Sequence, residues 1–263
     1  MVRVYHPTLS ASTLQTAGIV PQPLHPVKRH GPSWSLGKAA RDNLYHLYYD
    51  GSIGIAEEAM RSSEAVVCPA LSCEGVQMER RYLPNIAVAP PAVKVVLISE
   101  AAAAVEGDDY YQGPAALYEQ TTLAAFASAG LEAGSLRALL ERGIYCTTAV
   151  KCGKVGYSVP TAAIRSCSLL LERELALFTG VRAYLLMGDV AIKAVNAIAR
   201  RNREARPIPA GPTYRIRGGE FWWRGARAFP SYLQAGPSYG IEKTKVAMIA
   251  EDIAAALRLA SGG

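Results

Sequence analysis

The segment Tyr145-Cys146-Thr147-Thr148-Ala149-Val150-Lys151-Cys152 carries the strongest structural signal in the chain. It is rich in β-branched and aromatic residues over the length of a strand, so we expect a strand at residues 144–150. An amphipathic helix is expected next, over residues 160–178, with Cys167 on it. A buried strand that leads into a helix is the first half of a βαβ unit, which builds parallel sheets.

The alternation of strand and helix holds from residue 93 onward. Further strands are expected at residues 94–98, 182–187 and 225–229. Further helices are expected at residues 117–131, 135–141, 190–200 and 241–259. The pattern predicts an α/β fold, a single three-layer αβα domain with a central, mostly parallel four-stranded sheet. Ligands of such sheets bind outside the carboxyl ends of the strands.

The first part of the chain has a different composition. Prolines recur through residues 1–35, which disfavours regular elements there, and short helices are expected over residues 36–62. We therefore expect an N-terminal arm with short helices over residues 1–63. The α/β domain is expected over residues 64–263.

The charge balance is modestly basic, with 28 Lys and Arg against 22 Asp and Glu, a net charge of +6 and a pI near 9.1. This excess suits a polyanion such as nucleic acid, although many proteins that bind none are equally basic. No apolar run approaches the ~20 residues that span a bilayer, and the N-terminus lacks a signal-peptide layout, so no membrane contact and a cytoplasmic location are expected. Five cysteines in such a chain favour free thiols or metal ligands over disulfides.

Four segments, spread in order along the chain, carry a resemblance to a known family. They are Val93-Lys94-Val95-Val96-Leu97-Ile98-Ser99-Glu100-Ala101, the segment at 145–152, Arg182-Ala183-Tyr184-Leu185-Leu186-Met187-Gly188-Asp189, and Phe229-Pro230-Ser231. The segments resemble the G-E-A-P-G turn, the T-N-x-V-K-C strand, the strand ending in L-G and the H-P-S loop of the uracil-DNA glycosylase superfamily, nearest its iron–sulfur (fourth) family. The resemblance implies a monomeric DNA glycosylase that hydrolyses the N-glycosidic bond of uracil or another deaminated base in DNA.

The resemblance also implies a 4Fe-4S cluster. Cys68 and Cys73 precede the first motif strand, as the first cysteine pair does in the family, although their spacing is C-x4-C where the family has C-x2-C. With Cys152 and Cys167 they complete a set of four thiolate ligands. A structural zinc ion and unliganded buried thiols are the alternatives. Cys146 is left outside the set.

The catalytic candidates implied by the resemblance are Glu100, Asp109 and Ser231. Glu100 takes the place of the Glu in G-E-A-P-G, where a carboxylate at a strand end can orient water and oppose positive charge on the sugar. A solvated Glu at a helix N-terminus is the alternative reading. Asp109 belongs to an acidic pair that, in the family, precedes the aromatic under the base.

The base-binding candidates are Tyr110, Tyr111, Thr148 and Phe229. Either tyrosine is a candidate platform for the flipped base, the alternative being an exposed loop whose tyrosines pack on the surface. Thr148 replaces the family's base-reading Asn, and a hydroxyl cannot make the paired contact of an amide. Phe229 replaces the His of H-P-S and has no donor for the developing anion.

The segment after Phe229 resembles the family's minor-groove loop. Tyr232 or Leu233 is the expected wedge, with phosphate contacts from Gln234, Ser231, Lys243 and Lys245. A hairpin-like segment at residues 214–224 adds Arg217 and further arginines beside aromatic residues. An ordinary amphipathic surface hairpin is the competing interpretation of that segment.

Three functions remain open at this point. The first is a DNA glycosylase, and the second is a non-catalytic iron–sulfur nucleic-acid-binding member of the same superfamily. An iron–sulfur redox protein is the third, which the absence of the usual four-cysteine runs disfavours.

Overall fold

The structure is a computed structural model that describes residues 59–69 and 73–262. The chain divides into two compact units, Met1–Gly54 and Ile55–Gly263, and the description below concerns the second. The predicted N-terminal arm lies almost entirely outside the described residues. Among the described helices, none is both long enough and apolar enough to cross a membrane.

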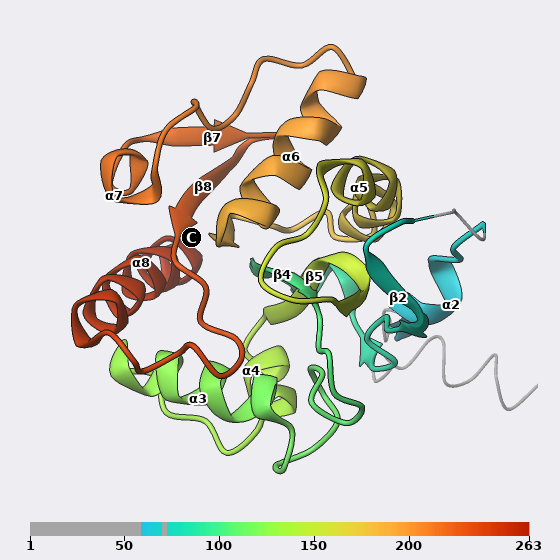
Figure 1. The fold of residues 1–263 in the computed structure, drawn as a ribbon. Coiled ribbons are helices and arrows are strands. Elements are labelled where there is room, and N and C mark those ends of the chain that lie inside the picture. Colours follow the sequence, from blue (N-terminus) through green and yellow to red (C-terminus); the bar gives the residue numbers. More distant parts are fainter. Residues whose placement is uncertain (1–58, 70–72, 263) are drawn as a thin grey trace, which may run out of the picture. The chain divides into compact units, whose positions relative to one another are not determined.

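The centre of the unit is a mixed six-stranded sheet with the order β2-β5-β4-β6-β8-β7 (Figure 1). Its strands are β2 (Val76–Arg81), β4 (Val95–Ala102), β5 (Ile144–Lys154), β6 (Ala183–Met187), β7 (Phe221–Trp223) and β8 (Ala226–Ser231). The four predicted strands correspond to β4, β5, β6 and β8, which are mutually parallel. The α/β class is confirmed, whereas the prediction of four strands was wrong because both sheet edges carry an additional antiparallel strand.

The two edge strands explain that error. Strand β2 reads Val-Gln-Met-Glu-Arg-Arg, which offers neither an apolar run nor a clean alternation, and charged residues of this kind are typical of protected sheet edges. The predicted hairpin at residues 214–224 was also wrong, because α7 (Thr213–Ile216) takes its first part. The hairpin instead joins β7 to β8 through Arg224 and Gly225, whose positive φ angles of 49° and 80° suit a two-residue type I′ turn.

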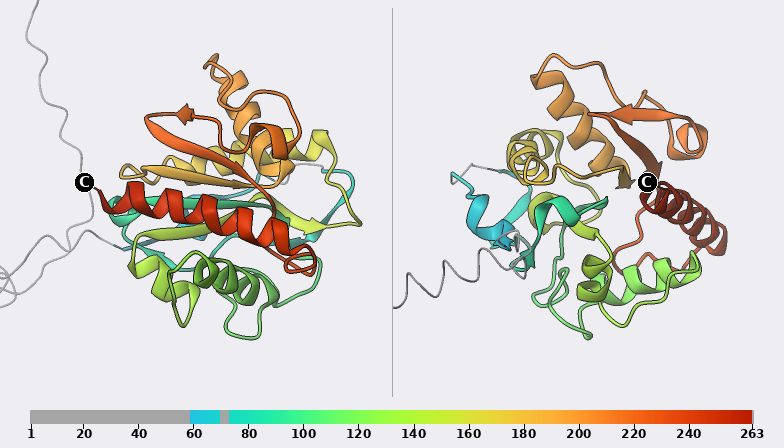
Figure 2. Two further views of the ribbon diagram at one scale, coloured as in Figure 1. Left: turned by 90° about the vertical axis from the view of Figure 1, so that its left-hand side faces the viewer. Right: turned by 180° about the vertical axis from the view of Figure 1, so that it is seen from behind.

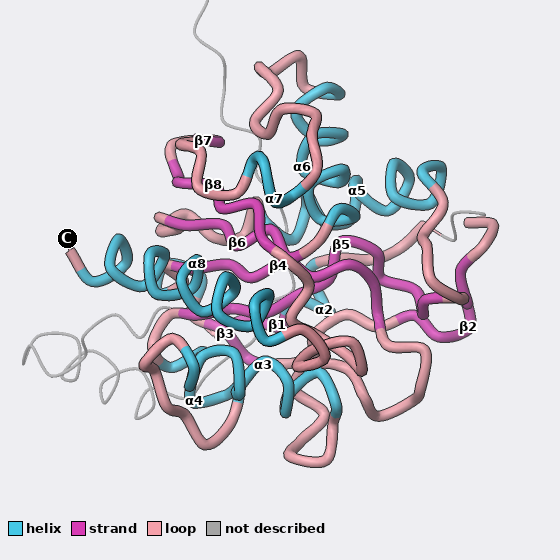
Figure 3. Tube along the Cα trace, turned by 60° about the vertical axis from the view of Figure 1, so that its left-hand side comes forward, coloured by secondary structure: helices cyan, strands magenta, loops and turns pink. Residues whose placement is uncertain are grey.

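Helices cover both faces of the sheet. On one face lie α5 (Thr161–Leu175) and α6 (Asp189–Arg201), and on the other lie α3 (Leu117–Ser128), α4 (Leu136–Glu141) and α8 (Lys243–Ser261). Figure 3 shows the strands between these two groups of helices, and Figure 2 shows α8 alongside the strands on the side of α3 and α4. Strand β4 is buried on both faces, with Val96 and Ile98 in one core and Val95 and Leu97 in the other, as expected of a central parallel strand.

A smaller group of elements precedes the first parallel strand. It consists of β1 (Met60–Arg61), α2 (Ser62–Ala65), β3 (Ala87–Val88) and a 3-10 turn at Pro90–Ala92. Strands β1 and β3 pair with each other. A buried hydrogen-bond chain ties this group to the sheet, because the hydroxyls of Ser62 and Tyr145 lie 2.8 Å apart and Tyr145 donates to Glu174 at 2.8 Å.

The parallel arrangement decides where polar groups meet. Leu97 is in register with Leu185, and Met187 with Ser231, so the carboxyl ends of β4, β6 and β8 lie together along the edge of the sheet where the parallel strands end, which differs from the lateral edges formed by β2 and β7. Glu100, Gly188 and Ser231 are the residues at or next to those ends. This edge is the expected location of a binding site in an open parallel sheet.

Candidate active site

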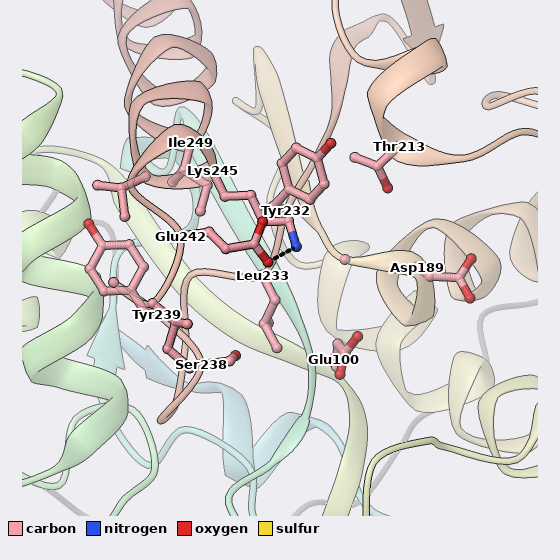
Figure 4. Close-up of a pocket in the computed structure, with 14 residues that line it drawn as sticks. Glu100, Asp189, Thr213, Tyr232, Leu233, Ser238, Tyr239, Glu242, Lys245 and Ile249 are labelled. Atoms are coloured by element: carbon pink, nitrogen blue, oxygen red, sulfur yellow. Dashed lines mark hydrogen bonds and ion pairs between the residues drawn. The ribbon is translucent and has the colours of Figure 1, made fainter.

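A pocket of about 310 Å³ opens at this edge, between the ends of β4 and β6 and the segment that leads from β8 into α8 (Figure 4). The polar and aromatic residues that line it are Glu100, Asp189, Thr213, Tyr232, Ser238, Tyr239, Glu242 and Lys245. Three of these side chains are carboxylates and one is an ammonium group. This charge balance disfavours a phosphate inside the pocket and is compatible with an uncharged ring.

Glu100 is the carboxylate that the strand end holds in the pocket. Its Oε2 atom accepts a hydrogen bond from Lys154 Nζ at 2.7 Å, and the two side chains are 17% and 23% exposed. Lys154 is the last residue of β5, the parallel neighbour of β4. A partly buried charge pair of this geometry restricts the carboxylate to one orientation and leaves Oε1 for another partner.

Gly188 makes room for that carboxylate. Its φ is 97°, a conformation that L side chains rarely adopt, and a Cβ there would lie 3.0 Å from Glu100 Oε1 and 3.1 Å from its Cγ. The residue ends β6 at the start of α6, which begins with Asp189. Glycine at 188 therefore allows both the tight strand-to-helix turn and the close approach of Glu100.

The loop before α8 forms the opposite wall. Lys245 donates to Glu242 at 2.6 Å, as the dashed line in Figure 4 shows, and its ammonium lies 5.5 Å from the centre of the Tyr232 ring. Leu233 and Tyr239 add apolar surface. The wall thus combines one cation with two tyrosine rings, which suits contact with a planar, polar ligand.

The predicted residues of the 108–112 loop lie outside the pocket lining. Asp109 is buried and accepts hydrogen bonds from the Ala103 backbone at 2.7 Å and from Arg80 at 3.0 Å, which closes the loop after β4. Burial raises the pKa of Asp109, and these two donors oppose the shift. The expected carboxylate is present, but its oxygens are engaged within the fold.

Both predicted platform tyrosines are likewise directed into the protein. Tyr110 is fully buried, and its hydroxyl accepts from Gln234 at 2.9 Å. The Tyr111 hydroxyl accepts from the Cys146 backbone at 2.8 Å. Neither lines the pocket, where Tyr232 and Tyr239 are the available rings.

The base-reading and strand-end candidates are engaged elsewhere too. The buried Thr148 hydroxyl donates to Val150 O at 3.0 Å. Phe229 packs on the core with the Arg227 guanidinium 5.0 Å from its ring centre. The Ser231 hydroxyl donates to Asp252 at 2.5 Å, which fastens the end of β8 to α8. None of these three side chains lines the pocket.

The DNA-contact candidates divide into two groups. Tyr232, Leu233 and Lys245 line the pocket, and Lys243 is exposed at the start of α8. Gln234 is buried, and Arg217 is neutralised by Glu251 at 2.5 Å and Asp252 at 2.9 Å. The pocket lining therefore contains Glu100, Tyr232, Leu233 and Lys245 but neither Arg217 nor Gln234.

The four cysteines of the predicted set lie on the side of the sheet covered by α5. Cys73, Cys152 and Cys167 belong to one buried cluster, and Cys68 packs against it. Burial raises the pKa of each of the three buried thiols, and the neighbouring cysteines raise each value further. Cys146 lies in the core on the other face.

No set of three His, Cys, Asp or Glu side chains within residues 59–69 and 73–262 has an arrangement that could hold a metal ion. A cubane cluster makes a different demand, because each cysteine binds its own iron atom and its ligands stand farther apart than those of one ion. Four thiols on the same face of the sheet are compatible with that demand. Cys167 also accepts a hydrogen bond from the Lys151 backbone at 3.1 Å, of the kind that stabilises a metal-bound thiolate.

Several groups at the site were missed by sequence reasoning, namely Lys154, Asp189, Thr213, Tyr239 and Glu242. Lys154 lay beyond the predicted end of its strand at residue 150, and Asp189 was assigned no role. A signal for Asp189 existed, because an acidic residue at the first turn of a helix is stabilised by the dipole and here directly follows a strand end. Lys154 offered no comparable signal.

Comparison with known proteins adds to this geometry. No protein-family model matches the chain. A type-5 uracil-DNA glycosylase of Thermus thermophilus is 32% identical over 77 residues. This similarity supports the uracil-DNA glycosylase superfamily. The match spans 29% of this chain and 35% of that glycosylase, and the iron–sulfur (fourth) family assignment stays a prediction.

Proposed function

We propose that this protein is a DNA glycosylase of the uracil-DNA glycosylase superfamily, which hydrolyses the N-glycosidic bond of uracil or another deaminated base. The observation that carries the proposal is the Glu100 carboxylate, held by Lys154 in a pocket at the carboxyl ends of parallel strands. The partial similarity to a uracil-DNA glycosylase supports the same reaction class.

The pocket has the character that an extruded base requires. Its volume of about 310 Å³ falls within the lower range of small-molecule sites, and its lining offers tyrosine rings for stacking and polar groups for a base edge. Tyr232 and Tyr239 take the platform role in this proposal, in place of Tyr110 and Tyr111. The acidic excess in the lining favours entry of the base and leaves the phosphates outside.

Glu100 has the central part in the proposed reaction. Its free oxygen orients a water molecule toward C1′ of the sugar, and its charge opposes the positive charge that develops there. The hydroxyl of the water adds to C1′, the C1′–N bond breaks with its electron pair on the base, and the water's proton passes to Glu100. The products are an abasic sugar and the anion of the base, which takes up one proton as Glu100 returns its own to the solvent and so becomes the free base.

The departing base receives less help than in a member with an intact H-P-S loop. Phe229 has no donor, and the loss of one such contact typically costs ~3–4 kcal/mol of transition-state stabilisation. Lys245 is the cationic donor that lines the pocket. We therefore expect uracil excision to be slower than in intact members by roughly two orders of magnitude.

A 4Fe-4S cluster held by Cys68, Cys73, Cys152 and Cys167 is part of the proposal. Such a cluster would join the segment before β2 to β5 and α5, which is an architectural contribution. The placement of all four cysteines on the same face of the sheet supports it. Cys146 has no part in it.

The second candidate function is DNA binding without excision. The Thr148 hydroxyl donates to Val150 O, so its proton is already committed within the strand. Together with Phe229 in place of the histidine, this observation favours a protein that has kept the fold and lost the excision activity.

A strand-cleavage assay separates the two functions. Oligonucleotides carrying uracil, hypoxanthine or xanthine are incubated with the protein and heated in alkali, with an abasic oligonucleotide as the positive control. The glycosylase proposal predicts alkali-sensitive cleavage at one or more of the three bases. Binding to the same oligonucleotides without any cleavage would replace it with the second function.

A further inference from the structure

A second concave surface lies between α5 and α6, away from the residues that line the pocket. This groove encloses about 660 Å³. Figure 1 shows the two helices packed side by side. The charged side chains that line the groove are Arg165, Lys193, Arg200, Arg201, Arg206 and Glu204.

The positive charge of this groove is only partly compensated. Glu204, its one acidic residue, already binds Arg224 at 2.8 Å, and Arg201 binds Glu172 at 2.5 Å. Within the described part of the chain, Arg165, Arg200 and Arg206 form no ion pair with any carboxylate. The charges of these three guanidinium groups are thus uncompensated, and Arg206 donates through its Nε atom to Ile208 O at 2.8 Å, which leaves its terminal nitrogens for an external anion.

Helix α6 contributes residues to both the pocket and the groove. Asp189 lines the pocket, and its carboxylate binds Lys193, which lines the groove, at 2.5 Å. The remaining groove residues of α6 lie further along the same helix. A chain molecule that places one unit in the pocket can therefore continue over α6 into the groove.

We propose that the groove binds the phosphate backbone of the DNA strand that delivers its base to the pocket. The inference rests on the proposed function, because that function supplies the DNA strand. The two surfaces have complementary charges, since the pocket lining is acidic while the groove is basic. Such a division directs the uncharged base into one surface and the phosphates onto the other.

Arginine suits this role better than lysine does. The planar guanidinium presents paired donors that match the oxygens of a phosphate, so each of the three arginines can make a bidentate contact. Neutralising a phosphate releases its condensed counterions, which makes the slope of log affinity against log salt a count of the contacts. Three contacts correspond to a slope of about two to three.

The test compares two triple variants of the full chain. In the groove variant, Arg165, Arg200 and Arg206 are changed to Gln. In the control variant, Arg137, Arg142 and Arg258 are changed to Gln, which removes equal charge from α4, the residue after it and α8, on the other face of the sheet. Affinity for single- and double-stranded DNA carrying an abasic-site analogue is measured over a range of salt concentrations, and circular dichroism checks the fold.

The groove variant should bind DNA at least tenfold more weakly than wild type at low salt, and its slope of log affinity against log salt should be smaller by about two to three. The control variant should match wild type within a change of about one in that slope. A third variant with Lys at the three groove positions should recover most of the slope. Equal slopes for the groove and control variants would overturn the groove inference while leaving the glycosylase proposal intact. Absence of DNA binding by wild type would overturn both.

A calorimetric titration distinguishes binding of a DNA strand from binding of a free anion. Inorganic phosphate is titrated into wild type and the groove variant by calorimetry. Weak or absent phosphate binding together with the slope difference supports a strand contact. Phosphate binding that the groove variant loses, with unchanged DNA affinity, would assign the groove to a small anion and overturn the inference.

Discussion

Lys154 donates a hydrogen bond of 2.7 Å to the Glu100 carboxylate and so joins the carboxyl ends of the parallel strands β5 and β4. Both side chains are mostly buried, at 23% and 17% exposure. Removal of one partner from such a pair leaves the other charge without compensation, which costs more than the pair itself contributes. The activity proposed for Glu100 should therefore depend on Lys154.

Lys154→Met should lower the excision rate roughly ten- to a hundredfold, because Glu100 loses the contact that fixes its orientation. In a Glu100→Gln background, the same change should have little further effect, since residues that act as one unit are not additive. Single-turnover rates of wild type, Lys154→Met, Glu100→Gln and the double variant complete this double-mutant cycle. Lys94→Met, before the amino end of β4, is the control and should retain the wild-type rate. Additive losses would show that Lys154 acts independently of Glu100.

Gly188→Ala should reduce excision by at least tenfold. The new methyl group would meet Glu100 Oε1 at 3.0 Å and displace the carboxylate, in addition to the strain at a φ of 97°. Gly130→Ala provides a matched control, because its φ is 87° and nothing lies within 4 Å of the added methyl group. Both variants should lose about 1 kcal/mol of stability, but only Gly188→Ala should lose activity. Similar activity in the two variants would contradict the proposed position of Glu100.

The cysteine assignment predicts a brown protein after anaerobic purification, with about four irons per chain. Cys152→Ala and Cys167→Ala should each lose most of the iron, whereas Cys146→Ala should retain it because Cys146 lies in the opposite core. Iron and zinc are measured by elemental analysis, and circular dichroism confirms folding. A colourless wild-type protein that holds only zinc, or full iron retention in the Cys152→Ala/Cys167→Ala double variant, would refute the cluster.

The lowered pKa of the Glu172 carboxyl group leads us to expect that the stability of the fold depends on pH. Burial alone would raise the pKa of this carboxyl group, but hydrogen bonds from Arg201 and Arg224 outweigh it and hold the pKa below its ordinary value of 4.5. A lowered pKa in the folded state means that the ionised group stabilises the fold above its unfolded-state pKa. That stabilisation is lost as the pH falls through the folded-state value.

Glu172→Gln should therefore be less stable than wild type at neutral pH, with a difference in the free energy of unfolding that narrows as the pH falls below the ordinary carboxyl pKa of 4.5. Urea unfolding of both proteins at several pH values measures this difference in the free energy of unfolding. Glu141→Gln removes an exposed carboxylate that forms no ion pair within the described residues, and at neutral pH it should stay within about 0.5 kcal/mol of wild type. A Glu172→Gln difference that grows toward low pH would contradict the assignment.

The fold was predictable where the sequence has a strong apolar pattern. Strands β4 and β5 are buried on both faces, so nearly all of their residues are apolar or small and the pattern is continuous. Strand β2 could not be found in this way, because an edge strand with polar residues has no core periodicity. Strand β7 has three residues, too few to show any period.

The site was predictable only in part for a related reason. Glu100 lies two residues after the apolar run at residues 95–98, so its place near a strand end could be read from the sequence. The partnership with Lys154 depends on β5 continuing past Val150 beside β4, where the register shifts between Ala101 and Ala102. The inward directions of Tyr110 and Tyr111 depend on buried hydrogen bonds with partners distant in sequence, which no local pattern encodes.

The most direct test of the account is the single-turnover rate of base excision by wild type and Glu100→Gln on uracil, hypoxanthine and xanthine oligonucleotides, together with their affinities for an abasic-site analogue. Glu141→Gln serves as the matched control. Glu100→Gln should lose excision activity by about a hundredfold or more while its affinity for the abasic-site analogue stays nearly unchanged, because the amide keeps the shape of the side chain and lacks its charge. Equal excision rates for wild type and Glu100→Gln on every base, or no excision by either, would contradict it.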